Sequence, residues 1–134
     1  MIIDACVLCE RLERGSGLQS SWITAHHIDC FWVIKSFPAI LQLSLLLRLR
    51  VEPEDPARFD AVVRAVDRKG GEIAVRQRHS MEAPRVSEAS SVPFATVNDE
   101  FSMSLNLPEA GEYSVEITIG DELRSLPIVV TKGT

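Results

Sequence analysis

The sequence predicts an all-β fold, a sandwich of two antiparallel sheets with about seven to nine strands. Apolar residues occupy every second position over 41–51, 101–107 and 113–119, which is the period of a strand with one buried face. Glycine- and proline-containing turn signals separate these runs at near-regular spacing. The only helical signal is a single possible turn at 55–59. Because 134 residues suffice for one core, we expect residues 1–134 to form one domain.

The run from Leu41 to Val51 is expected to be the central strand of one sheet. Its odd positions are all Leu or Val, and its even positions are polar apart from Leu46, so one face should be dry and the other wet. Two earlier strands are expected at Ile2–Arg11 and Leu18–Ala25. The turn at Arg14–Gly17 would join them into a hairpin, since its glycines adopt positive φ at low cost.

The other elements follow from the same signals. His26–Ser36 is irregular and precedes Pro38, which predicts a connection across the end of the sheets or a bent edge strand. Ile73 and Val75 are expected on one face of the strand at 72–78, which follows the hairpin turn at 68–71. The later elements are a turn at 52–56, a strand at 59–67, a hairpin turn at 68–71 with a return strand at 72–78, a surface loop at 79–92, and strands at 101–107, 113–119 and 126–130.

Composition excludes several functional classes. The net charge of −5 argues against nucleic acid as a partner, because phosphate binding needs a basic surface. The longest uncharged run, 36–47, contains Pro38 and is too short to span a membrane, and no secretory signal opens the sequence. We therefore expect a cytoplasmic protein whose Cys6, Cys9 and Cys30 remain reduced thiols.

Two groups of residues could carry chemistry. Cys6 and Cys9 form C-x-x-C inside an apolar strand, where they would face opposite ways, so we interpret them as buried hydrophobic residues. His26, His27 and Cys30 are possible zinc ligands, which keeps a small-molecule or metal-binding protein as the alternative function.

Nothing in the sequence predicts an enzyme. We find no nucleophile elbow and no phosphate-binding loop, and we assign no catalytic residue, cofactor or metal.

Four aromatic residues, Trp22, Phe31, Trp32 and Phe37, are the best functional candidates. They could plug one end of the core, or they could form an exposed interface, where Trp and Phe are enriched. We predict a non-enzymatic protein–protein interaction module that binds another protein or a second copy of itself. Strand addition at an open edge is one possible mode, and the Ala83–Val92 loop is a further candidate surface.

The segment Pro108–Ile119, PEAGEYSVEITI, resembles the end of bacterial immunoglobulin-like modules. The resemblance implies that the Tyr113 hydroxyl bonds to backbone upstream of its strand, at a corner with Gly111. The order of features, from the first hairpin through Ser36-Phe37-Pro38-Ala39 and the Leu-Arg-Leu strand to this corner, is similar to a family of small, uncharacterised bacterial β-sandwich proteins. That resemblance implies an immunoglobulin-like sandwich and brings no activity.

Overall fold

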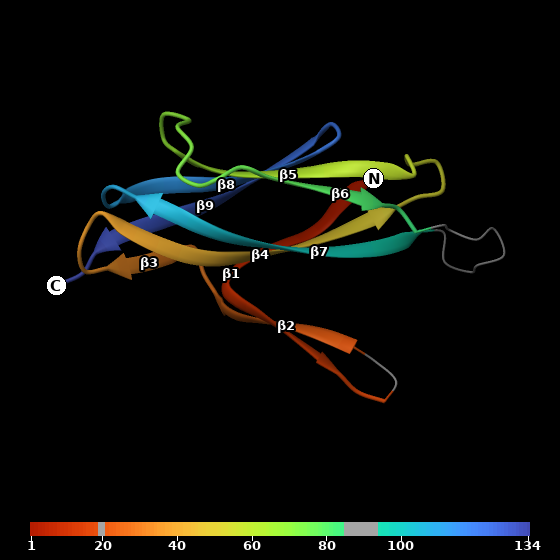
Figure 1. Ribbon diagram of the computed structural model, residues 1–134, viewed down its shortest axis with the longest axis horizontal. Helices are drawn as coiled ribbons and strands as arrows, with labels where there is room; N and C mark the ends of the chain where they lie inside the picture. The colour runs from red at the N-terminus through yellow and green to blue at the C-terminus, as the bar shows by residue number, and fades with distance from the viewer. Residues whose placement is uncertain (19–20, 85–93) are drawn as a thin grey trace.

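Two β-sheets face each other in the computed structural model, which describes residues 1–18, 21–84 and 94–134 (Figure 1). Over these residues the chain forms nine strands and no helix, so the predicted all-β sandwich is confirmed. The strands are β1 (Ile2–Ser16), β2 (Ser21–Ile28), β3 (Phe31–Ile34), β4 (Ala39–Val51), β5 (Arg58–Asp67), β6 (Gln77–Glu82), β7 (Ala95–Leu107), β8 (Gly111–Ile119) and β9 (Glu122–Lys132).

The sheets have the orders β2-β1-β4-β7 and β3-β9-β8-β5-β6. Every pair is antiparallel except β3 with β9, which is parallel, so the expectation of two purely antiparallel sheets is wrong at this edge. The chain leaves the first sheet after β2, crosses to the second, and there runs beside β9 in the same direction. The segment after His26 thus supplies a short edge strand, one of the two alternatives that the sequence left open.

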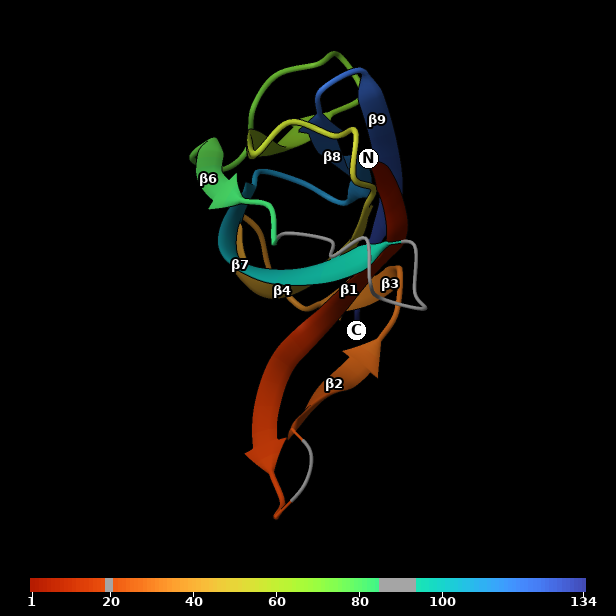
Figure 2. The same cartoon turned by 90° about the vertical axis from the view of Figure 1, so that its right-hand side faces the viewer.

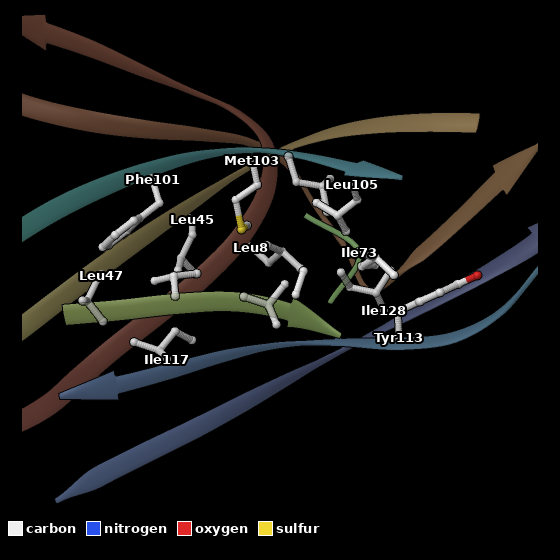
Figure 3. Packing of buried hydrophobic residues seen from close by; sticks show 14 of the residues in the cluster. Leu8, Leu45, Leu47, Ile73, Phe101, Met103, Leu105, Tyr113, Ile117 and Ile128 are labelled. Carbon is white, nitrogen blue, oxygen red and sulfur yellow. The ribbon is translucent and has the colours of Figure 1, made fainter. Parts of the chain in front are cut away.

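The core forms between the inner faces of the sheets. β4 pairs with β7 from Ala39 opposite Leu107 to Val51 opposite Ala95, so β4 is central as predicted. Its odd-numbered residues from Leu43 onward are at most 2% exposed. Figure 3 shows the side chains of β4 and β7 pointing toward those of β8 and β9, including Ile117 and Ile128. This arrangement confirms that the period of two marks the buried face.

Two expected turns differ from the structure. β1 continues through Ser16 and β2 begins at Ser21, so the predicted turn at 14–17 and the predicted start of the second strand at Leu18 are wrong. The helical turn expected at 55–59 is also absent. There the backbone amide of Asp55 donates to the carbonyl of Glu52 at 3.0 Å, the Asp55 carboxylate accepts from the Glu52 amide at 2.8 Å, and β5 begins by Arg58.

The segment at 72–76 is not the predicted return strand. The amide of Ile73 donates to the carbonyl of Ala65 at 2.9 Å, and the carbonyl of Ile73 accepts from the amide of Asn106 at 2.7 Å. The segment therefore bridges the two sheets. Ile73 is buried and Val75 is 85% exposed, so the expectation that both lie on one face is wrong.

The predicted loop at 79–92 begins later than expected. Residues 79–82 belong to β6, because this strand pairs with β5 as far as Glu82 opposite Arg58. Residues 85–92 of the predicted loop, and with them most of the Ala83–Val92 candidate surface, lie outside the described residues.

The corner before β8 contains the hydrogen bond that the sequence predicted. The Tyr113 hydroxyl donates to the carbonyl of Glu109 at 2.6 Å. Burial raises the pKa of this hydroxyl, so it stays protonated and able to donate at neutral pH. The bond ties the turn between β7 and β8 to the strand that follows it.

Candidate functional site

A hairpin projects from the sandwich because β1 belongs to two strand pairs. From Ile2 to Cys9 it pairs with β4, and from Cys9 to Ser16 it pairs with β2. Among the described residues, no other strand pairs with β2. The hairpin formed by β1 after Cys9 and by β2 extends away from the two sheets (Figure 2), and we call it the arm.

The structure divides the four aromatic candidates into two pairs. Trp22 on β2 is 52% exposed and Phe31 on β3 is 59% exposed. Trp32 and Phe37 are partly buried and pack against the core. Within β3 the cause is the strand alternation, which turns Phe31 outward and Trp32 inward. Trp22 and Phe31 are thus exposed, and Trp32 and Phe37 are packed against the core.

On β2 and β3, two further exposed apolar residues were missed by the sequence analysis. Ile28, at the end of β2, is 66% exposed, and Val33 on β3 is 72% exposed. The alternation of β3 was the available signal for Val33, since a residue two positions from an outward Phe31 shares its face. Ile28 gave no such signal, because nothing in the sequence shows that the arm leaves the core.

Trp22 lies against the backbone of the neighbouring strand. It is opposite Gly15 in the register of the arm. A Cβ atom added to Gly15 would come within 2.4 Å of two atoms of the indole ring. The indole therefore occupies the space of the missing side chain, which explains why a glycine stands inside β1 rather than in a turn.

We expect Gly15→Ala to displace the Trp22 indole into solvent, because the added methyl group and the ring cannot share that space. In a Trp32→Phe background, where Trp22 is the remaining tryptophan, its fluorescence emission should shift to longer wavelength. Ser16→Ala, at an exposed neighbouring position, is the control and should leave the emission unchanged. An unchanged emission maximum in Gly15→Ala would contradict the packing of Trp22 on Gly15.

A cleft of about 650 Å³ lies between the arm and the outer face of the four-stranded sheet. Leu46, the one apolar residue at the even positions between Leu41 and Val51, lines this cleft. Arg14 on the arm reaches Glu100 on β7 with an Nε to Oε1 distance of 3.0 Å. The residues lining the cleft are Ala5, Arg14, Gly15, Ser16, Trp22, Ile23, Leu46, Arg48 and Asn98.

The two arm histidines each contact a carboxylate of β1. His26 Nε2 lies 2.8 Å from Glu13 Oε2, and His27 Nδ1 contacts the Glu10 carboxylate. In the part of the chain that the structure describes, which includes His26, His27 and Cys30, no three His, Cys, Asp or Glu side chains form a metal-binding group.

The C-x-x-C thiols face opposite ways, as predicted. Cys6 pairs with Leu47 on the core side of the sheet, and Cys9 pairs with Ser44 on the other side. Cys9 is fully buried at the base of the arm, where its Sγ donates to the carbonyls of Arg11 at 3.4 Å and Ser44 at 3.6 Å. Burial raises the pKa of both thiols, which disfavours the reactive thiolate.

A third histidine forms a separate pair. His79 on β6 stacks on Phe101, with ring centroids 3.9 Å apart, and its Nδ1 lies 2.7 Å from Asp99 Oδ2. The pair joins the outer strands β6 and β7 of the two sheets. These contacts give His79 a structural role, since its ring covers Phe101 in the core and the Asp99 carboxylate orients the ring.

Comparison with known proteins gives one match. Residues 32–131 match a sequence family described as a family of unknown function (DUF6941). The matched region runs from β3 to β9 and begins after the arm. Comparisons with curated proteins and with solved structures find no match. Within the described ranges there is no helix long and apolar enough to cross a membrane.

Proposed function

The chain belongs to the DUF6941 family, whose function is unknown, and we propose that it is a protein–protein interaction module that binds through the arm and β3. The observation that carries this proposal is the exposure of large apolar side chains on a projecting hairpin and its adjoining strand. Trp22, Ile28, Phe31 and Val33 are each more than half exposed. We call these four residues the apolar surface.

Exposed apolar side chains favour association, because burying them against a partner gains roughly 25 cal/mol per Å² of apolar surface. Tryptophan and phenylalanine supply large, rigid contacts of the kind that anchor interfaces. The outer face of β5 and β8, in the five-stranded sheet, differs, since it carries ion pairs such as Arg64 with Glu116 at 2.7 Å. This contrast supports the apolar surface as the binding region.

The proposal includes three further expectations. The module is not an enzyme, which the raised pKa values of the partly buried Cys6 thiol and the buried Cys9 thiol support. It works in the cytoplasm, where free thiols such as these persist. Its sandwich is immunoglobulin-like, which the hydrogen bond from Tyr113 to Glu109 supports.

The test compares partner capture by the wild-type chain and by a Trp22→Ala/Phe31→Ala variant. Each immobilised protein is exposed to extract of the native host and to a tagged second copy of the chain, and bound proteins are identified by mass spectrometry. We expect the variant to retain about tenfold less of the specific partner, since interface aromatic residues commonly contribute more than 1 kcal/mol each.

Ile40→Ala/Leu123→Ala is the matched control. These two residues are 68% and 60% exposed, and both lie away from the apolar surface. The control should capture as much partner as the wild-type chain does. Equal capture by all three proteins, with thermal unfolding showing that each is folded, would contradict the proposal.

A further inference from the structure

We infer that the partner of the arm is a second copy of this chain, and that the two copies pair their β2 strands antiparallel about a two-fold axis at Thr24. This inference rests on the proposed function, since it names the partner of the arm, and it shares Trp22 with the apolar surface. It is carried by the composition of β2, by its extended backbone up to His26 and by the two-stranded structure of the arm.

In the described parts of the chain, β2 has no strand on the side away from β1, and this edge lacks the residues that normally prevent strand addition. β2 is eight residues long and contains no Asp, Glu, Lys, Arg or Pro. The edge strands β6 and β7 carry such charges, whereas the other edge strand, β3, has none but is only four residues long. On β6, Arg78 and Glu82 pair with acidic and basic residues of β5, and β7 carries Asp99 and Glu100. Natural proteins use charge and proline to block pairing at sheet edges, so β2 is an edge left open to another strand.

The regular part of β2 determines the register. The strand is extended up to His26, whereas His27 has a φ of 55° that turns the backbone out of the ladder. A two-fold axis perpendicular to a sheet places one residue opposite its own copy. With the axis at Thr24, the paired region runs from Trp22 to His26 and stops before the irregular residue.

The cross-strand neighbours in this register are complementary. Trp22 of one copy faces His26 of the other, whose ring is already held by Glu13. Thr24 faces Thr24, and the partly buried Ile23 and Ala25 face each other on the opposite side. Aromatic and Thr–Thr pairs stabilise antiparallel ladders, and no two charges of like sign are opposed. A strand that is complementary to itself in this way favours a second copy over an unrelated chain.

The pairing also supports the arm. A two-stranded ribbon is only marginally stable in water, and three or more strands are needed for independent stability. Two arms joined at β2 form a four-stranded unit, and the four-stranded sheets of both copies become one continuous sheet. One two-fold contact supports both arms at once and closes the assembly, as isologous interfaces do.

Sedimentation equilibrium of the full chain tests the inference. We expect the wild-type mass to correspond to a dimer and Thr24→Lys to raise the dimer dissociation constant about tenfold or more, because two lysines would then be opposed on the axis. Thr118→Lys is the matched control, with the same change at an exposed strand position on β8, and it should leave the constant unchanged. Circular dichroism verifies that both variants fold.

Disulfide cross-linking tests the register independently. In a Cys30→Ser background, Thr24→Cys should form an intermolecular disulfide on mild oxidation, because directly opposed residues in an antiparallel pair are within disulfide distance. Ser104→Cys, exposed on the edge strand at the other side of the same sheet, is the control and should remain monomeric on a non-reducing gel.

The outcomes separate this inference from the proposed function. A wild-type chain that sediments as a monomer, or a dimer equally stable in Thr24→Lys and Thr118→Lys, overturns the second copy as the partner. If partner capture nonetheless depends on Trp22 and Phe31, the apolar surface binds another protein and the proposed function stands. If the dimer does not depend on Thr24 and partner capture does not depend on Trp22 and Phe31, both the inference and the proposed function are wrong.

Discussion

Leu45→Ala is expected to lower the free energy of unfolding by about 2–5 kcal/mol, the range for removing a leucine from a packed core. Leu45 is 0% exposed and lies opposite Phe101, itself 1% exposed, at the centre of the four-stranded sheet. The truncation removes apolar contacts with both sheets and leaves a cavity between them. Chemical denaturation followed by circular dichroism measures the change.

The neighbouring residue is the matched control for this prediction. Leu46 is the same residue type one position along β4, and its side chain is partly exposed at the cleft on the outer face. Leu46→Ala should cost less than about 1 kcal/mol, as substitutions near the surface usually do. Similar losses for the two variants would contradict the assignment of odd-numbered β4 residues to the core.

The core could be predicted from the sequence because alternation is a local signal with one structural meaning. A two-residue period places the apolar residues of β4, β7, β8 and β9 on one face, and that face must be buried somewhere. The same signal failed at residues 72–78. Ile73 and Val75 are two positions apart, but the backbone there bonds to both Ala65 and Asn106 instead of forming a regular ladder.

The arm could be predicted as a hairpin, but its departure from the sandwich could not. Leu12, Ile23 and Ala25 alternate with polar residues just as those of a packed strand do. Whether such a face is covered depends on which strand lies beside it, and this is a property of the whole fold. The turn was misplaced for a related reason, since Gly15 serves the packing of Trp22 and not a bend of the chain.

The sequence showed where the aromatic cluster lies in the chain, but not which of its residues are exposed and which pack on the core. Clustering in the sequence shows that Trp22, Phe31, Trp32 and Phe37 are close along the chain, and it gives no information on which way each points. The division within β3 follows from its parallel pairing with β9, which the sequence did not indicate. Once β3 is known to be an edge strand, alternation alone assigns Phe31 to the solvent and Trp32 to the core.

This division leads to opposite expectations for two adjacent aromatic residues. Trp32→Ala should destabilise the fold by about 3 kcal/mol, the lower end of the range for core tryptophans, because Trp32 is only partly buried. It should unfold at clearly lower denaturant concentration than the wild-type chain does. Phe31→Ala removes a side chain that is 59% exposed and should change the free energy of unfolding by about 0.5 kcal/mol or less.

Binding should show the reverse order. Phe31→Ala should weaken partner capture while the protein remains fully folded, since its ring contacts solvent in the isolated chain. Trp32→Phe keeps an aromatic ring against the core and should retain both stability and capture. A Trp32→Ala variant as stable as Phe31→Ala would show that the inward face of β3 is not part of the core. In that case the choice of Phe31 and Val33 as its outward residues would also be wrong.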